Sequence, residues 1–315
     1  MRSYSAAETR ERLAFRPLIE ALRAMFERGC VVPPRQVLEI GGDGGDAVTS
    51  LVMTAWQPGG CYGVKVVNIA AGNGARGLPG LHSTYVLHDA RTGVPLAWID
   101  GDEITARRTA ATSALAASWL AAPAARQLAL IGAGRIARLL PEAHRVVRPI
   151  ERVAVWARSP ARAAALVDEL AAQGFDARVA PSVAAAVAEA DIVSCATLAR
   201  APLVVGRWLA PGSHLDLIGS FTPAMREADD DCFARATVVV DSDDAAQKSG
   251  DLIAPIANGV LAAASIGTLA GLARGGAGAL PATPLRRTVF KSVGSALEDL
   301  AAAMLVHGAD VQRRT

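Results

Sequence analysis

Apolar residues near the start of the chain recur at helical spacing. Ser5 is followed three residues later by Glu8, the arrangement of a capping box at a helix N-terminus. Apolar side chains then repeat every three or four positions from Leu18 to Met25, until two consecutive prolines interrupt the pattern. This opening segment predicts one helix followed by a break.

Four strand-like runs follow the prolines. They are rich in β-branched residues and are separated by Gly, Asn and Pro turn signals, with no helical pattern between them. The runs cover residues 47–56, 60–69, 81–90 and 93–100. Consecutive strands without intervening helices predict an antiparallel sheet. The alanine-rich segment 105–121 contains neither Gly nor Pro, which predicts a single long helix.

The second half of the chain alternates apolar strands with helices. We expect strands at 128–131 and 152–156, with helices at 135–147 and 160–173. Four more strand-like runs lie at 176–180, 191–197, 214–219 and 237–241. This alternation is typical of βαβ units and predicts a parallel sheet of about six strands. After the GALPATP link at 278–284, residues 285–305 have helical character.

A chain of 315 residues is long enough for two domains. We expect an α/β protein in which residues 116–284 form a doubly wound parallel sheet. Residues 1–115 would form a second, α+β domain for substrate binding and dimerisation, which the C-terminal helix within 285–315 would join.

Composition narrows the functional class. Hydrophobic residues make up 51% of the chain and its formal charge is +2, which disfavours disorder and an electrostatic grip on nucleic acid. The four cysteines are scattered without CxxC spacing, and the five histidines lack ligand spacing, so we expect no metal site. The N-terminus lacks an apolar leader and no long apolar span occurs, which predicts a cytoplasmic protein without membrane contact.

The segment GAGRIA follows one of the apolar strands and opens a helix. It contributes Gly132, Gly134, Arg135, Ile136 and Ala137. In this context the pattern G-x-G-x-x-A predicts a Rossmann-type dinucleotide site, where glycines allow a tight turn and the helix N-terminus offers N–H groups to a pyrophosphate. A glycine turn without a ligand is the alternative, which the surrounding βαβ pattern disfavours.

The strand after the glycine turn ends in Arg158 and Ser159. An acidic residue at this position would suit the ribose of NAD, but none is present. A guanidinium beside a hydroxyl suits a 2′-phosphate, so the sequence favours NADPH over NADH. The alternative is that Arg158 only begins a solvated helix face.

Three basic residues of the first domain stand out: Arg35 after the prolines, Lys65 and Arg108. Lys65 lies between Val64 and Val66 in a strand-like run, so by itself it could lie on the solvated side of a sheet. Arg107 is the neighbour of Arg108, lies about 100° away around the helix and is expected to be solvated.

Five stretches in order resemble the ornithine cyclodeaminase/mu-crystallin family over nearly the whole chain. They are GVKVVNIAAGNGARGLPG, GDEITARRTAATSALA, GAGRIA, LIGSFTPAMRE and TVFKSVGSALEDLAAA, starting at residues 63, 101, 132, 217 and 288. The family includes cyclodeaminases of ornithine and lysine, alanine dehydrogenases, reductases of cyclic ketimines and a hormone-binding lens protein, so the resemblance permits several functions.

The resemblance implies roles for particular residues. Arg35, Lys65 and Arg108 fall on positions that hold the substrate carboxylate at the domain cleft, with Lys65 as the catalytic candidate. The nicotinamide or the substrate would be lined by Thr197, the backbone of 217–220 including Gly219 and Ser220, Ser292 and Val293. The resemblance also implies a homodimer through the N-terminal sheets, which would cover exposed strand edges.

One position departs from the family pattern. Members that deaminate amino acids have an aspartate two residues after the glycine of VGxDxPG, where this chain has Phe221. A phenyl ring cannot act as a base. Glu227 and the acidic residues 229–231 are expected to form a solvated helix start rather than to replace that aspartate.

These features together predict NADPH-dependent reduction of a cyclic imino acid, such as a pyrroline- or piperideine-2-carboxylate, to the cyclic amino acid. An ornithine cyclodeaminase and an amino-acid dehydrogenase are the enzyme alternatives. An NADPH-dependent small-molecule binding protein similar to the crystallin is the alternative from another class.

Overall fold

The computed structural model describes residues 1–41, 47–275 and 285–308. The chain divides into two compact units: unit 1 comprises Met1–Arg108 with Ser295–Thr315, and unit 2 comprises Thr109–Gly294. The units therefore divide at 108/109 and 294/295, whereas the sequence placed the domain boundaries at 115/116 and 284/285. The expected link at 278–284 lies outside the described residues. No described helix is long and apolar enough to cross a membrane.

Unit 1 is a mixed sheet with helices on one face. Its strands are β1 (Arg2–Tyr4), β2 (Gln36–Ile40), β3 (Val48–Trp56), β4 (Cys61–Ala70), β5 (Leu81–Asp89) and β6 (Pro95–Asp100), in the order β1-β6-β5-β4-β3-β2. Its helices are α1 (Ala6–Arg12), α2 (Phe15–Arg28), the 3₁₀ turn η1 (Ala71–Arg76), the start of α3 (Gly101–Leu120) and α10 (Ala296–His307). All strand pairs are antiparallel except β1 with β6.

The four expected strands of unit 1 and the long helix α3 are confirmed, while β1 and β2 were missed. The expected N-terminal helix is two helices, because Leu13 ends α1 before α2 begins. The capping box is confirmed: the Glu8 backbone N–H donates to Ser5 Oγ, and Ser5 N–H donates to the Glu8 carboxylate.

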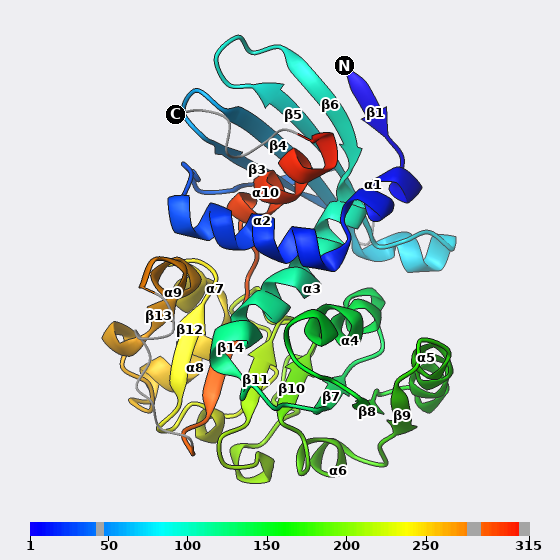
Figure 1. The fold of residues 1–315 in the computed structure, drawn as a ribbon, viewed down its shortest axis with the longest axis vertical. Helices are drawn as coiled ribbons and strands as arrows, with labels where there is room; N and C mark the ends of the chain where they lie inside the picture. Colours follow the sequence, from blue (N-terminus) through cyan, green and yellow to red (C-terminus); the bar gives the residue numbers. More distant parts are fainter. Residues whose placement is uncertain (42–46, 276–284, 309–315) are drawn as a thin grey trace. The chain divides into compact units, whose positions relative to one another are not determined.

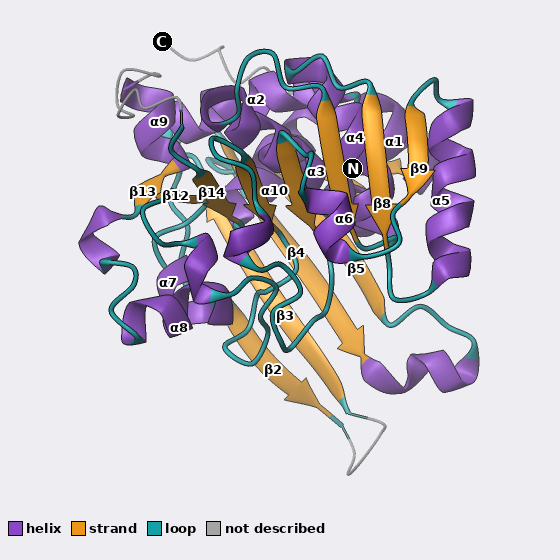
Figure 2. Cartoon of the chain, turned by 90° about the horizontal axis from the view of Figure 1, so that it is seen from below, coloured by secondary structure: helices purple, strands orange, loops and turns teal. Residues whose placement is uncertain are grey.

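Helix α10 covers the inner face of the unit 1 sheet, against β3, β4 and β5, and α2 packs on α10 (Figure 1). Figure 2 shows β3 and β4 as long neighbouring strands. One row of buried side chains crosses strands β3 to β6 and consists of Met53, Lys65, Tyr85 and Ile99. Gly63 is required beneath the Tyr85 ring, because a Cβ there would lie 1.9 Å from the phenol oxygen.

Unit 2 contains a parallel sheet. Among the described residues its strands are β7 (Gln127–Ile131), β8 (Arg152–Trp156), β9 (Asp176–Val179), β10 (Ile192–Cys195), β11 (His214–Leu217), β12 (Thr237–Val240), β13 (Gly267–Thr268) and β14 (Thr288–Lys291). Its further helices are α4 (Arg135–Val147), α5 (Pro160–Ala172), α6 (Val183–Val187), α7 (Ala245–Lys248), α8 (Gly250–Ala257) and α9 (Leu269–Gly275), with 3₁₀ turns at Gly206–Trp208, Asp230–Cys232 and Ala263–Ser265.

The strand order of unit 2 is β13-β12-β14-β11-β10-β7-β8-β9. From β7 the chain first moves outward through β8 and β9, and then returns to place β10 on the other side of β7. This reversal is the switch point of a doubly wound sheet, and ligands of such sheets bind at the carboxyl ends of the strands beside it. The expected Rossmann-type fold is therefore confirmed.

The prediction that residues 285–305 are helical throughout was wrong. Thr288–Lys291 form β14, which lies between β11 and β12 and adds to the expected strands, and α10 begins only at Ala296. The run TVF is β-branched and aromatic, as in a buried strand, and Gly294 with φ +78° turns the chain before the helix.

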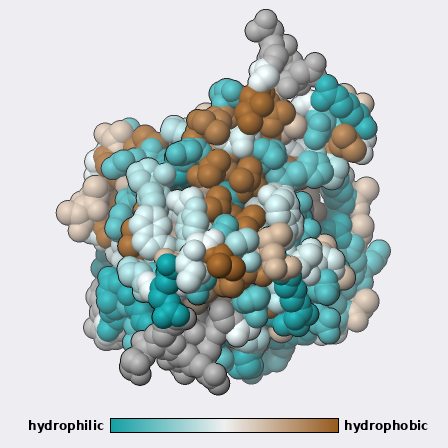
Figure 3. Space-filling view, turned by 90° about the horizontal axis from the view of Figure 1, so that it is seen from above, coloured by the Kyte–Doolittle hydropathy of each residue, from teal (hydrophilic) through white to brown (hydrophobic). Residues whose placement is uncertain are grey.

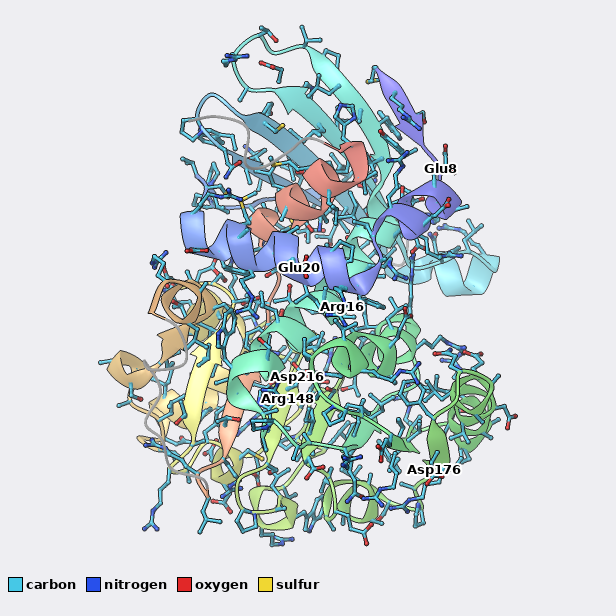
Figure 4. The ribbon with its side chains drawn as sticks, viewed as in Figure 1. Glu8, Arg16, Glu20, Arg148, Asp176 and Asp216 are labelled. Atoms are coloured by element: carbon cyan, nitrogen blue, oxygen red, sulfur yellow. The ribbon has the colours of Figure 1, made fainter. Side chains whose placement is uncertain are left out.

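A buried polar network lies inside unit 2. Asp216, labelled in Figure 4, accepts hydrogen bonds from Ser113 on α3 at 3.0 Å and from Ser194 on β10 at 2.7 Å. His144 Nε2 on α4 lies 3.2 Å from the Ser194 hydroxyl oxygen. These four side chains are fully buried, so the network ties two helices to the centre of the sheet.

Candidate active site

The glycine turn lies between β7 and α4, at the carboxyl edge of the unit 2 sheet. Gly132 has φ +118°, and a Cβ on it would lie 2.7 Å from the carbonyl oxygen of Ala196. Gly134 is the N-cap of α4, and the space where its Cβ would stand is open. Ala137 is buried at the base of the helix. The turn thus has the bare backbone and open helix N-terminus that a pyrophosphate requires, with Arg135 and Ile136 in the first turn of α4.

Arg158 and Ser159 follow the neighbouring strand β8, whose Trp156 pairs with Ile131. Ser159 is the N-cap of α5, where its hydroxyl accepts the Arg162 N–H at 3.4 Å. Arg158 is exposed. Both residues therefore lie at the same sheet edge as the glycine turn, where the sequence placed the 2′-phosphate contacts.

Thr197 and Gly219 follow β10 and β11, and one side chain holds both. Glu227 Oε1 accepts the Thr197 N–H at 2.8 Å and its hydroxyl at 2.7 Å. Glu227 Oε2 accepts the Gly219 N–H at 2.7 Å. The expectation that Glu227 is solvated was wrong, because this side chain is fully buried. A nearby proline and acidic neighbours suggested a surface segment, but local sequence carries no information about these long-range contacts.

Ser220 and Phe221 differ in exposure, since Ser220 is fully buried and Phe221 is not. The Ser220 hydroxyl donates to the Met225 carbonyl at 2.6 Å and lies 2.7 Å from the Ser249 hydroxyl, so it is occupied within the protein. Phe221 is 38% exposed although it is a large apolar residue. Single exposed apolar residues are common, so the exposure of Phe221 does not by itself assign it a role.

Ser292 and Val293 follow β14 and are fixed by Asp241, which follows β12. Asp241 Oδ2 accepts the Ser292 hydroxyl at 2.8 Å, the Val293 N–H at 2.8 Å and the Gly294 N–H at 2.7 Å. Asp241 was not among the site residues predicted from the sequence. The signal for it was an aspartate directly after the apolar run TVVV, at the end of a parallel strand.

A second missed residue is Lys291, the last residue of β14. It is fully buried, donates to the Leu217 carbonyl at 3.0 Å and lies 3.5 Å from Asp251 Oδ2. Its signal is a lysine within the apolar run VFKSV. A buried ammonium without an ion partner would be costly, which explains the fully buried Asp251 beside it.

In unit 1, Lys65 is 1% exposed and points to the inner face of the sheet. Its ammonium lies 2.7 Å from Asp299 Oδ2 and donates to the Thr105 hydroxyl at 3.2 Å. Burial lowers the pKa of Lys65 to about 8, although the Asp299 carboxylate acts against this shift. The alternative that Lys65 lies on the solvated side of its strand is thereby excluded.

Arg108 joins the same cluster from α3. Its Nη1 lies 2.5 Å from Glu298 Oε2 and its Nε lies 3.0 Å from Asp299 Oδ1. Lys65 and Arg108 therefore face two carboxylates from the first turn of α10, and these four charges sum to zero. The family resemblance implied a substrate carboxylate as the partner of Lys65, and in the structure the protein's own Asp299 carboxylate takes this place. Glu298 and Asp299 were missed as partners, although two acidic residues within the apolar run SALEDLAAA indicated buried charge.

Two further arginines, Arg107 and Arg35, lie in different environments. Arg107 is 6% exposed, so the prediction that it is solvated was wrong. Its Nε donates to the Leu13 carbonyl at 2.7 Å, and its guanidinium lies over the Phe15 ring at 4.3 Å. Arg35 is half-buried just before β2, whose first residue Gln36 pairs with Val52 of β3. No described contact joins Arg35 to Lys65.

The described residues, which leave out 42–46, 276–284 and 309–315, contain no cluster of metal-ligating side chains. The candidate functional residues form two groups, one in each unit. One is the carboxyl edge of the unit 2 sheet, which has the features of a dinucleotide site. The other is the buried cation and carboxylate cluster of unit 1, which combines acid–base groups with donors for an anion.

Comparisons with known proteins show which family the chain resembles. The model of the ornithine cyclodeaminase/mu-crystallin family matches residues 6–313. The chain is 41% identical to the Δ1-pyrroline-2-carboxylate reductase of Paracoccus denitrificans, over 94% of this chain and 93% of that protein. It is 35% identical to the ketimine reductase mu-crystallin of Rattus norvegicus, over 92% and 90% of the two chains.

A solved structure is also similar. It is the Δ1-pyrroline-2-carboxylate reductase of Thermococcus litoralis in complex with NADH and L-proline, with a TM-score of 0.90 and 31% identity. The match covers 98% of this chain and 97% of that chain.

Proposed function

This chain belongs to the ornithine cyclodeaminase/mu-crystallin family, and on that basis we propose that it reduces a cyclic imino acid to the cyclic amino acid with a nicotinamide cofactor. Pyrroline-2-carboxylate and piperideine-2-carboxylate are the substrates that we propose. The observation that carries the proposal is the fully buried Lys65, whose ammonium lies 2.7 Å from Asp299 Oδ2. Burial lowers its pKa to about 8, which suits a proton donor near neutral pH. The similar proteins named above are reductases of this kind.

The residues divide the reaction between them. The glycine turn at Gly132 and Gly134, with Thr197, Gly219 and Ser292, would hold the cofactor, which supplies the hydride for the C=N carbon when bound. Arg108 and Arg35 would bind the substrate carboxylate through charge-assisted hydrogen bonds, with Val293 beside the substrate. Lys65 would donate a proton to the imine nitrogen, so that one hydride and one proton complete the amine.

We propose NADPH as the preferred cofactor. The proposal rests on Arg158 and Ser159 at the end of β8, because a guanidinium and a hydroxyl suit a 2′-phosphate. The similar Thermococcus litoralis structure contains NADH, which supports a nicotinamide cofactor but not the phosphate preference.

We also propose a homodimer through the outer face of the unit 1 sheet. Thr54, Val64, Val86 and Trp98 form one row on this face, and Trp98 is 44% exposed. Apolar residues gather in a band on the face of the molecule drawn in Figure 3. Light scattering should give a dimer, and Trp98→Glu should shift the protein to monomers. A monomeric wild-type protein would contradict the proposal.

The deciding experiment measures NADPH oxidation by the purified chain with pyrroline-2-carboxylate and piperideine-2-carboxylate. We expect turnover with at least one of them and negligible ammonia release from ornithine, because Phe221 cannot serve as the base that deamination needs. Robust conversion of ornithine to proline would favour a cyclodeaminase. Tight NADPH binding without either activity would favour a binding protein.

A further inference from the structure

Glu227 joins two loops that leave different strands of unit 2. Its two carboxylate oxygens accept three hydrogen bonds: two from Thr197, after β10, and one from Gly219, after β11. The two backbone N–H donors go to different oxygens. Both oxygens are therefore needed as acceptors, since a backbone N–H cannot reverse its role as a hydroxyl can.

The two loops meet with no spare room. A Cβ on Gly219 would lie 1.9 Å from the Thr197 carbonyl oxygen and 2.5 Å from Glu227 Oε1. Backbone atoms cannot yield to such a contact as a flexible side chain can. The loops therefore approach as closely as they do because residue 219 is a glycine, and the Glu227 carboxylate accepts hydrogen bonds from both of them.

A buried network in turn fixes Glu227. Asp251 Oδ1 on α8 accepts the N–H groups of Glu227 and Ala228 at 2.8 and 3.0 Å. Asp251 Oδ2 lies 3.5 Å from Lys291 Nζ, and Lys291 donates to the Leu217 carbonyl two residues before Gly219. Glu227, Asp251 and Lys291 are all fully buried. Two carboxylates and one ammonium leave a net charge of −1 when all three are ionised.

We propose that Glu227 is a positioning residue of the cofactor site: its carboxylate holds Thr197 and Gly219 in the geometry that binds the nicotinamide nucleotide. This inference rests on the proposed function only in assigning the two loops to the cofactor. Glu227 itself is fully buried, and it acts through the Thr197 and Gly219 groups that donate to it.

The protonation of Glu227 provides a second way to test this inference. Burial is the main cause that raises its pKa to about 7, with Lys291 acting against it and Asp251 adding to it. The other titratable groups that interact with it electrostatically include the Cys195 thiol on β10, whose pKa burial raises well above its usual value. The carboxylate is the stronger acceptor, so the loops should be held better above this pKa than below it.

The main test is Glu227→Gln, measured by calorimetric titration of the full-length protein with NAD⁺ and with NADPH. A glutamine must turn its NH₂ group toward one of the two backbone N–H donors. We expect binding to weaken at least tenfold, with KM for the cofactor rising more than kcat falls. Glu189→Gln, an isosteric change at an exposed residue of the same unit, should leave binding unchanged.

The pH profile separates positioning from a merely structural role. NAD⁺ is the probe, because the 2′-phosphate of NADPH itself titrates near pH ~6. Wild-type affinity for NAD⁺ should rise between pH 6 and 8, and Glu227→Gln should abolish the rise. Asp251→Asn keeps the acceptor for the Glu227 and Ala228 N–H groups but removes a negative charge. It should therefore move the midpoint of the rise in NAD⁺ affinity to lower pH.

The outcomes are distinct. A Glu227→Gln protein that melts as the wild type does and binds NAD⁺ equally well at all pH values would overturn the inference, even if imine reduction is confirmed. Weakened binding would support it even if no cyclic imine is reduced. If Glu227→Gln does not fold, the Asp251→Asn midpoint decides: a shift to lower pH supports the inference and an unmoved midpoint overturns it. A wild-type protein that binds neither nucleotide would overturn both proposals.

Discussion

Lys65 and Asp299 form a fully buried ion pair, with Nζ 2.7 Å from Oδ2, although more than two hundred residues separate them in the chain. Lys65 comes from the middle of β4 and Asp299 from the first turn of α10. The helix thus closes the inner face of the sheet with the carboxylate that the buried ammonium requires.

Truncating the two cations should have different kinetic effects. Arg108→Ala should mainly raise KM by weakening carboxylate binding, whereas Lys65→Ala should also lower kcat, by roughly 10²–10⁴-fold if it supplies the proton. Steady-state kinetics with the cyclic imine measure both. Arg152→Ala, an exposed arginine of unit 2, is the control. Unchanged kinetics in both variants would remove Lys65 and Arg108 from the site.

Asp299→Asn should shift the pH dependence of kcat. If the Lys65 ammonium is the acid, kcat falls as pH rises through its pKa of about 8. Asp299 raises that pKa, so its loss should move the fall in kcat to lower pH. A profile measured from pH 6 to 10 tests this shift. An identical profile in the variant would show that another group carries the proton.

Arg158 should determine the choice between cofactors. We expect NADPH to bind at least about tenfold tighter than NADH, which corresponds to about 1.4 kcal/mol. Arg158→Ala should remove this preference through weaker NADPH binding, with little change for NADH. Arg152→Ala is a matched control at the opposite end of β8. Equal wild-type affinities for the two nucleotides would refute the assignment.

His214 should make stability depend on pH. It is fully buried, and burial lowers its pKa from 6.5 to about 4. The unfolded chain binds the proton more readily than the folded protein. The contribution of His214 to the free energy of unfolding is therefore complete above pH 6.5 and is lost as pH falls toward 4. Between pH 7 and 5 the loss from this group is about 2 kcal/mol.

The variant His214→Asn keeps a donor toward the Thr288 hydroxyl oxygen, which lies 2.9 Å from His214 Nδ1, and removes the titration. Urea unfolding at pH 7 and 5 should show a smaller pH effect in this variant. His82→Asn, at an exposed histidine, should behave as the wild type does. If His214→Asn loses as much stability as the wild type between these pH values, the titration lies elsewhere.

The sequence by itself determined the elements that local interactions specify. The capping box at Ser5 and the limits of α4 and β8 agree with the sequence analysis, because caps, period and glycine positions act within a few residues. The glycine turn could also be predicted from the sequence, because residues 132–137 alone determine its backbone conformation. The likeness to a family supplied Lys65 and Arg108 as candidates.

Only the tertiary structure decided which charges meet. It paired Lys65 and Arg108 with Asp299 and Glu298, buried Glu227 behind two loops, and made Thr288–Lys291 a strand between β11 and β12. In each case the deciding partner is distant in sequence or lies beyond a turn, so no local pattern contains it. Burial sets the cost of leaving a charge or a backbone N–H unpaired, and burial exists only once the chain has folded.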